Sequence, residues 1–154
     1  MKRTKLKRKS KSPTAKLQQK LVELSHTYIR ERDSVSPDKI GGYCFDCGNF
    51  AEGRHFQAGH FIADASGGAV LRYHPHNMHG QSSGCNMKVS QERVKIEYTI
   101  KMQEKYGIDY VNLLRSLKNK SIKADEIFYN KMIELYEQKD EEAIVEYLNS
   151  LVGF

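Results

Sequence analysis

The residues whose types and spacing most clearly indicate a chemical role are three cysteines that could share one metal ion. Cys44 and Cys47 are separated by two residues and followed by Gly48, a spacing at which a tight turn can aim two thiolates at one zinc ion. A redox-active pair has the same spacing, but it needs a βαβ context that does not follow here. Cys85 offers a third thiol, and a tetrahedral zinc site needs a fourth ligand. The candidates for that ligand are His79 and, less favourably, His74 and His76.

A second group of chemically capable side chains lies between and beside the cysteines. It consists of one imidazole, His60, and two carboxamides, Asn77 and Asn86. A lone histidine among strand-forming residues, as in Gly59–Ile62, is more often structural than catalytic. Its place among the expected zinc ligands, together with the two asparagines, makes it a candidate catalytic residue.

An N-terminal helix is predicted to precede these groups. Ser12 as N-cap and Pro13 at the first helical position indicate a helix over residues 13–33. An apolar stripe at helical spacing supports it, formed by Leu17, Leu21, Leu24 and Tyr28. The segment Ser34–Gly42 contains proline and two glycines, so it is predicted to be a linker.

The middle region, residues 43–107, has a different character. It holds all three cysteines and five of the six histidines, and its first part shows no helical periodicity. Short strands are expected at His55–Ala63 and Val70–Tyr73, separated by a turn at Asp64–Gly68. Because this region has few apolar residues, a metal ion is the natural way to stabilise its fold.

The remainder of the chain is predicted to be helical. A helix from Ser90 should end at Gly107, which can take a left-handed C-terminal conformation. In the acidic segment 108–154, Asp109 and Asp140 are expected to cap further helices. The predicted fold class is therefore α+β, with a small zinc-stapled core flanked by N-terminal and C-terminal helices.

The net charge of +6 is unevenly distributed along the chain. Residues 1–40 carry 12 basic and 4 acidic side chains (+8), residues 41–120 carry 10 and 7 (+3), and residues 121–154 carry 3 and 8 (−5). Residues 1–12 are therefore predicted to be a disordered basic arm. The arm would either bind nucleic-acid phosphates through counterion release or serve only as a solubilising tail. Its basic residues are Lys2, Arg3, Lys5, Lys7, Arg8, Lys9 and Lys11.

The composition of the 154-residue chain indicates one domain with tails. Mean hydropathy is −0.66, and no run of about 18 apolar residues is present, so a membrane protein is not expected. A signal peptide is not expected either, because charged residues at positions 16, 20 and 23 interrupt any apolar segment. Three cysteines, two of them closely spaced, suit a reducing, cytoplasmic compartment better than a disulfide framework.

The order of these motifs resembles the HNH, or His-Me finger, nucleases, whose ββα-metal core is often held by a zinc ribbon. More narrowly, the chain is similar to the NinG/Rap family of phage recombination endonucleases over roughly residues 14–107. The shared motifs, in chain order, are Tyr28–Asp33, Cys44–Gly48, Gly59–Phe61, Leu71–Tyr73, Asn77–Gln81, Cys85–Asn86, Tyr98 and Tyr106–Gly107.

The resemblance implies metal-dependent hydrolysis of phosphodiester bonds. His60 would be the general base, since a neutral imidazole can accept a proton from water near pH 7. Asn77 would hold the loop and orient His60, and Asn86 would bind one catalytic Mg²⁺ or Mn²⁺. The structural zinc would be a separate site, because thiolates select zinc whereas an amide oxygen suits a hard cation. Arg72 and Lys88 would contact phosphates of the DNA.

Two positions depart from these family patterns. Ser82 stands where the family has its third cysteine, so zinc would keep three thiolates, with His79 as the candidate that completes the site. A ribbon without zinc is the alternative. Gly59 stands where many HNH enzymes have a metal-binding aspartate, as it also does in the NinG-like pattern. The second ligand of the catalytic cation is therefore left to Asp64 or His55.

The expected substrate is branched DNA, such as a Holliday junction or a D-loop. No recognition helix is evident, so selection should come from backbone contacts and duplex shape. Cutting both strands of a junction needs two active sites, which favours a homodimer. If the chain is encoded by a phage or prophage, it would act in the bacterial host cytoplasm. Two other functions stay open: a zinc-containing DNA-binding module without nuclease activity, and a protein-interaction adaptor that uses the acidic C-terminal helices.

Overall fold

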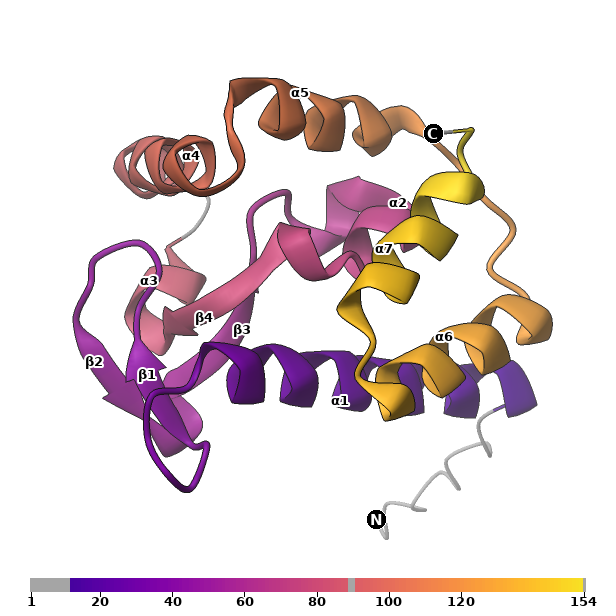
Figure 1. Ribbon diagram of the computed structural model, residues 1–154, viewed down its shortest axis with the longest axis horizontal. Helices are drawn as coiled ribbons and strands as arrows, with labels where there is room; N and C mark the ends of the chain where they lie inside the picture. The colour runs from indigo at the N-terminus through magenta and orange to yellow at the C-terminus, as the bar shows by residue number, and fades with distance from the viewer. Residues whose placement is uncertain (1–11, 89–90, 154) are drawn as a thin grey trace, which may run out of the picture.

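Helix α1 (Pro13–Asp33) runs along one side of the molecule, where it lies beside both the central strands and helix α6 (Figure 1). The computed structural model describes residues 12–88 and 91–153. The Ser12 hydroxyl accepts a hydrogen bond from the backbone N–H of Ala15 at 3.2 Å, and Pro13 occupies the first turn. The predicted start of this helix is therefore confirmed. The predicted basic arm falls almost wholly outside the described residues.

A short hairpin carries two of the three cysteines. Strand β1 (Gly41–Tyr43) pairs antiparallel with β2 (Phe50–Glu52), and the tight turn between them holds Cys44 and Cys47. Gly48 in this turn has φ +73°, a conformation that favours glycine. One turn of 3₁₀ helix, η1 (Gly53–His55), then leads into the next strand.

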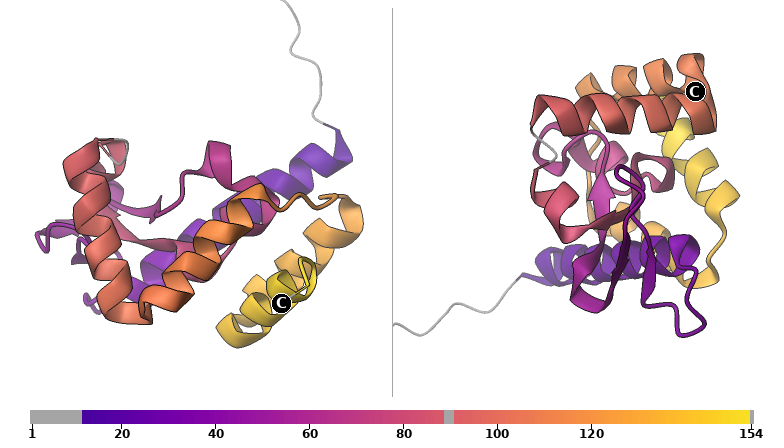
Figure 2. Two further views of the ribbon diagram at one scale, coloured as in Figure 1. Left: turned by 90° about the horizontal axis from the view of Figure 1, so that it is seen from above. Right: turned by 90° about the vertical axis from the view of Figure 1, so that its left-hand side faces the viewer.

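A second antiparallel pair of strands lies between α1 on one side and the helices α4 and α5 on the other (Figure 1, Figure 2). In this pair Gly59 is opposite His79, and Gln57 is opposite Gln81. Side chains alternate between the two faces of a strand, so these four residues share the face turned away from α1. The elements of this unit are β3 (Phe56–His60), β4 (Met78–Ser82) and the short helix α3 (Ser83–Met87) that follows them.

The connection between β3 and β4 differs from the expectation. Residues Asp64–Arg72 form helix α2, followed by the 3₁₀ turn η2 (Pro75–Asn77). The predicted turn at residues 64–68 and the predicted strand over residues 70–73 are therefore wrong. Gly68, with φ +68°, breaks α2 into two pieces, and Val70 and Leu71 are fully buried in the main core. A short apolar run has no periodicity of its own, so tertiary packing decided its conformation.

The C-terminal half is helical, as the sequence predicted. Gly107, with φ +84°, ends α4, and the Asp140 side chain accepts a hydrogen bond from the Ala143 N–H at 3.0 Å, which confirms both predicted helix ends. Asp109 does not cap its helix, because that helix already begins at Ile108. The elements are α4 (Glu92–Tyr106), α5 (Ile108–Ser116), η3 (Leu117–Asn119), α6 (Glu126–Gln138) and α7 (Glu141–Ser150).

One hydrophobic core joins these helices to α1 and α2. It contains buried residues from α1, α2, α4, α5, α6 and α7, among them Leu21, Leu71, Met102, Leu114 and Met132. The observed fold is a mixed α+β arrangement with two small sheets. Within the described ranges, no helix combines the length and the apolar character needed to cross a bilayer.

Candidate active site and metal centre

The three cysteines form a cluster that can hold one metal ion. The Sγ atoms of Cys44, Cys47 and Cys85 all lie within 4.8 Å of one another. Backbone hydrogen bonds position them: Cys44 N–H donates to Asn49 O at 2.8 Å, and Gly48 N–H donates to Cys44 O at 2.9 Å. Three thiols at this spacing fit a structural metal such as zinc. In the metal-free protein burial raises the pKa of Cys85 to about 12, so metal binding would have to displace its proton.

Ser82 borders the thiol cluster and supplies the start of α3. Its hydroxyl accepts a hydrogen bond from the Cys85 backbone N–H at 3.3 Å, which makes it the N-cap of this helix. The same hydroxyl also interacts with the thiols of Cys47 and Cys85. An oxygen atom therefore stands beside two of the three sulfur atoms, those of Cys47 and Cys85.

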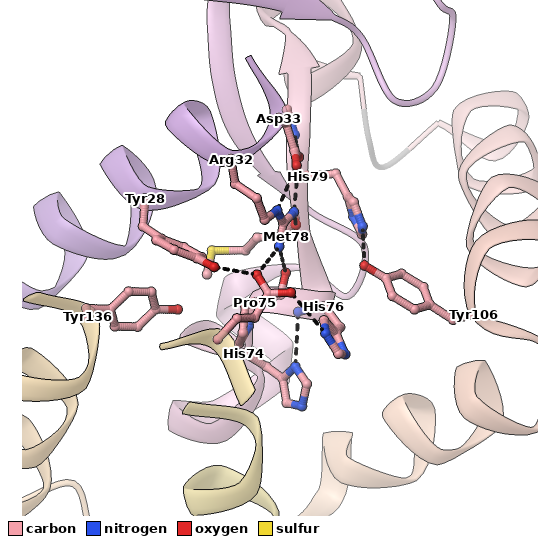
Figure 3. Close-up of polar contacts among 12 residues, drawn as sticks. Tyr28, Arg32, Asp33, His74, Pro75, His76, Met78, His79, Tyr106 and Tyr136 are labelled. Carbon is pink, nitrogen blue, oxygen red and sulfur yellow. Dashed lines mark hydrogen bonds and ion pairs between the residues drawn. The ribbon is translucent and has the colours of Figure 1, made fainter. Parts of the chain in front are cut away.

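His79, the expected fourth zinc ligand, does not lie in the thiol cluster. Its ring is fully buried and stacks on Phe45 with centroids 3.9 Å apart. Its Nδ1 lies 3.2 Å from the Tyr98 hydroxyl, and its Nε2 lies 2.9 Å from the Tyr106 hydroxyl (Figure 3). Because both ring nitrogens are hydrogen-bonded to tyrosines, the structure gives His79 a place in the core packing.

The other two histidine candidates, His74 and His76, lie just before β4, and His76 takes part in a network centred on Arg32 (Figure 3). The Arg32 guanidinium donates to Pro75 O at 3.1 Å and to Met78 O at 2.8 Å, and it pairs with Asp33 and Glu141. Glu141 also accepts a hydrogen bond from Tyr28 at 2.8 Å and approaches His76 at 3.2 Å. We call Tyr28, Arg32, Asp33, His76 and Glu141 the Arg32 network; it ties α1 to η2, β4 and α7.

His60 closes strand β3 and has a defined orientation. Its Nε2 lies 2.9 Å from the backbone oxygen of Arg72. A carbonyl oxygen can only accept a hydrogen bond, so the proton belongs on Nε2 and the basic lone pair on Nδ1. The ring also meets that of His26 on α1 edge-on, with centroids 5.9 Å apart.

Asn77 stabilises the segment that contains Arg72, whose backbone carbonyl contacts His60. Its Nδ2 donates to Ile62 O at 3.0 Å and to Leu71 O at 2.9 Å, while its Oδ1 accepts from the Ile62 N–H at 2.9 Å. The side chain is fully buried. All of its hydrogen-bonding groups therefore hold the ends of the β3–β4 connection in place.

Asn86 lies beside the neighbouring residue of β3. Its Nδ2 donates to Gln57 Oε1 at 2.9 Å, and its Oδ1 lies 3.0 Å from the position that a Cβ on Gly59 would occupy. Consecutive strand residues face opposite sides. The structure therefore sets Asn86 beside one face of β3 and His60 on the other, and does not bring the two side chains onto one face.

A cleft along the edge of β3 connects the two faces. Its volume is about 410 Å³. Ala58 lines the cleft from the face of β3 that also carries His60. Gln57 and Asn86 line it from the opposite face of the strand. Helix α1 closes the cleft with Glu23, His26 and Arg30, among others.

Three of the residues that α1 contributes to the cleft were missed by the sequence analysis. Glu23, His26 and Arg30 follow one another at spacings of three and four, so they form a polar stripe on the helix. That spacing was available in the sequence. It was overlooked because the apolar stripe on the opposite side already explained the helix as a packing element.

The remaining predicted residues are placed as follows. The Arg72 guanidinium lies 5.8 Å from the ring centroid of Tyr73, and Lys88 is exposed at the end of α3. His55 lies at the surface, with Nδ1 3.2 Å from the Ser83 hydroxyl. Asp64 begins α2, and its side chain lies outside the described part of the structure. Lysines and arginines at positions 2–11 also lie outside it.

The fold and the thiol cluster define a small α+β protein that can hold one structural metal ion such as zinc. Over residues 1–144 the chain matches the family described as Bacteriophage Lambda NinG protein. The chain belongs to this NinG family of phage proteins. No curated protein and no solved structure gives a significant match.

Proposed function

We propose that the protein is a structure-specific DNA endonuclease that cleaves branched recombination intermediates by metal-dependent phosphodiester hydrolysis. The observation that carries this proposal is the contact between His60 Nε2 and Arg72 O, because it leaves the basic lone pair on Nδ1. A histidine held in one tautomer by a backbone carbonyl is suited to act as a general base. Membership of the NinG family and the basic N-terminal residues support a DNA substrate.

The proposed reaction uses His60, whose ring meets that of the cleft residue His26, together with residues that line the β3-edge cleft. Water attacks the phosphorus atom, His60 Nδ1 accepts the proton, and the bond from phosphorus to the leaving 3′ oxygen breaks, with that oxygen taking a proton from solvent. Arg30 in the cleft can neutralise a non-bridging phosphate oxygen. A Mg²⁺ or Mn²⁺ ion at the Asn86 amide oxygen would stabilise negative charge on the phosphate and on the leaving oxygen. This oxygen donor fits a hard cation.

Substrate selection follows from the charge and not from base reading. The proposed DNA contacts are the N-terminal basic arm together with Arg72 and Lys88, all of which would touch the phosphate backbone. Such contacts favour any duplex, so preference for a junction would come from the shape of a bent or branched substrate. Symmetric incision of a junction would require a second copy of the chain.

A zinc-containing DNA-binding module without catalysis is the second candidate, and one observation favours it. His60 and Asn86 lie on opposite faces of β3, so a phosphate must span the strand edge to reach both. The cleft is lined by Asn86 and by His26, whose ring contacts that of His60, and for this reason we prefer the nuclease.

The deciding experiment is cleavage of a four-way junction, a flap and a linear duplex in Mg²⁺ and in Mn²⁺, with binding measured in Ca²⁺. We expect the junction to be cut, and His60→Ala to retain binding while the cleavage rate falls about 100-fold or more. Added imidazole should restore part of the lost rate. An unmodified protein that binds but never cuts in either ion would establish the binding module instead. Full activity of His60→Ala would remove His60 as the base.

A further inference from the structure

The face of β3 that carries Gly59 has an unusual neighbour. A Cβ placed on Gly59 would lie 1.4 Å from Oε1 and 2.4 Å from Cδ of Gln81. The carboxamide of Gln81 therefore occupies the space into which any side chain at position 59 would project. An aspartate at position 59 cannot coexist with Gln81 in this arrangement.

The Gln81 carboxamide is buried and only half satisfied. The residue is fully buried, and its Nε2 donates a hydrogen bond to Oδ2 of Asp46, which is 5% exposed. Among the described residues, Gln81 Oε1 and Asp46 Oδ1 are buried oxygen atoms without a hydrogen-bond partner. Buried oxygens are nearly always paired, and an exception calls for an explanation, of which a bound water or ion is one.

A second amide oxygen lies close to the unpartnered oxygen of Gln81. Asn86 Oδ1 is 3.0 Å from the Gly59 Cβ position, and Gln81 Oε1 is 1.4 Å from it, so the two oxygens are at most about 4.4 Å apart. Two ligands of one octahedral Mg²⁺ or Mn²⁺ ion, each about 2.1 Å from it, are separated by at most about 4.2 Å. The upper bound of about 4.4 Å slightly exceeds this limit, so the two oxygens can share one small hard cation at any separation up to about 4.2 Å.

Both amides are held with these oxygens turned inward. Gln57 accepts the Nδ2 hydrogen bond of Asn86, and Asp46 accepts that of Gln81. Asp46 lies between the cluster residues Cys44 and Cys47, so the carboxylate that orients Gln81 is itself fixed by the hairpin turn. Partners of this kind orient metal ligands in many proteins.

We propose that Gln81 Oε1 and Asn86 Oδ1 together bind the divalent cation, with Gln81 taking the place of an acidic ligand at position 59. Asp46 is the positioning residue: it holds the Gln81 carboxamide and supplies negative charge beside the ion. The role of this cation in cleavage rests on the proposed function, whereas its binding does not. The arrangement also makes the orientation of Gln81 depend on the folded thiol cluster.

The test measures Mn²⁺ binding to the zinc-loaded full chain by electron paramagnetic resonance, with zinc content determined in parallel. Gln81→Met keeps the volume of the side chain but removes the oxygen. We expect it to weaken Mn²⁺ binding at least about tenfold while one zinc per chain remains. Gln103→Met, on helix α4, is the matched control and should bind Mn²⁺ as the unmodified protein does.

A double variant keeps the proposal falsifiable if Gln81→Met folds poorly. Gly59→Asp combined with Gln81→Ala moves the oxygen ligand from one strand to the other, so Mn²⁺ affinity should return to within about threefold of the original, or exceed it. Unchanged Mn²⁺ affinity in Gln81→Met, or no binding by the double variant, would overturn the proposal. If Mn²⁺ binding depends on Gln81 but the protein never cuts DNA, the proposed function fails and this site stands.

Discussion

Two polar regions flank the β3–β4 strands, the half-buried Arg32 network and the buried pair Gln81 and Asp46, and they differ in how completely their atoms are paired. In the Arg32 network, one guanidinium meets two carboxylates and two backbone carbonyls, and Glu141 in turn meets a tyrosine and a histidine. Around Gln81, one hydrogen bond joins two buried side chains, and each keeps an oxygen without a partner. The groups of the first region are paired with one another, whereas the second has two oxygens that a cation could use.

The pKa values of one carboxylate in each region also separate the two regions: one is lowered and the other is raised. Burial alone would raise the pKa of Glu141, but the His76 hydrogen bond and the Arg32 charge hold it well below its usual range. At Asp46, burial raises the pKa to about 6, and the Gln81 hydrogen bond does not offset it. A buried carboxylate without a cationic partner is costly. In this protein, full pairing of the polar atoms accompanies a structural role, whereas incomplete pairing indicates a site where a ligand can bind.

The largest expected effect of a single substitution comes from breaking the Arg32 network. Arg32→Met leaves two carboxylates and two carbonyls with fewer partners, so we expect the free energy of unfolding to fall by about 3 kcal/mol. Urea unfolding of the zinc-loaded protein measures it. Arg93→Ala is the control: its ion pair with Glu97 is on the surface, with the Arg93 side chain 85% exposed, and its loss should cost about 0.5 kcal/mol or less. Equal effects of the two changes would contradict the structural role of the network.

The second prediction concerns crowding at Gly59. Gly59→Ala should cost about 2 kcal/mol, because its Cβ would overlap Gln81 Oε1. In the background of Gln81→Ala most of this cost should disappear, and the difference is the coupling energy of a double-mutant cycle. Gly84→Ala is the control, since nothing lies within 4 Å of its Cβ position. Additive effects of the two substitutions would mean that Gln81 does not occupy this space.

Acid should destabilise the histidine-rich side of the sheet. Burial lowers the pKa of His74 to about 3, and burial also lowers that of His79 well below its usual range. The folded protein keeps both rings neutral, whereas the unfolded chain takes up protons below about pH 6.5. Stability should therefore fall as the pH drops from about 6.5 toward 3, by about 1.4 kcal/mol per pH unit for each ring. Urea unfolding between pH 7 and pH 5 should give a flatter profile for His79→Gln. An equally steep profile would contradict the assignment.

The smallest expected change tests the thiol cluster. Ser82→Cys places a fourth sulfur next to Cys47 and Cys85, so zinc affinity should rise about tenfold or more, which corresponds to about 1.4 kcal/mol. Competition with a chromogenic chelator measures the affinity. A Co²⁺-substituted sample should also show stronger thiolate-to-metal absorption. An unchanged affinity would mean that position 82 does not face the ion.

Much of this architecture could be read from the sequence where local chemistry decides it. Ser12–Pro13, Gly107 and Asp140 set helix ends through their own backbone and side-chain properties, and Cys44-x-x-Cys47 with Cys85 predicted the cluster that the fold assembles. Helix α2 could not be predicted, because the run around Val70 gains its conformation from the core. Likewise, His79 joins the tyrosines of α4 only through tertiary packing.

The site illustrates a second limit of sequence reasoning. The type and order of His60, Asn77 and Asn86 are evident in the chain, but strand alternation decides which of them share a face. The part played by Gln81 depends on a contact between residues on neighbouring strands, and the part played by His26 depends on how α1 packs. Neither the contact of Gln81 with Gly59 nor that of His26 with His60 can be predicted from the neighbouring residues in the sequence.

The most direct test of the comparison is a crystal structure of the protein with zinc and Mn²⁺, with anomalous scattering recorded for each metal. Zinc should lie among Cys44, Cys47 and Cys85. We expect Mn²⁺ density between Gln81 Oε1 and Asn86 Oδ1, and none in the Arg32 network. Mn²⁺ bound at Glu141 with no density beside Gly59 would contradict the account.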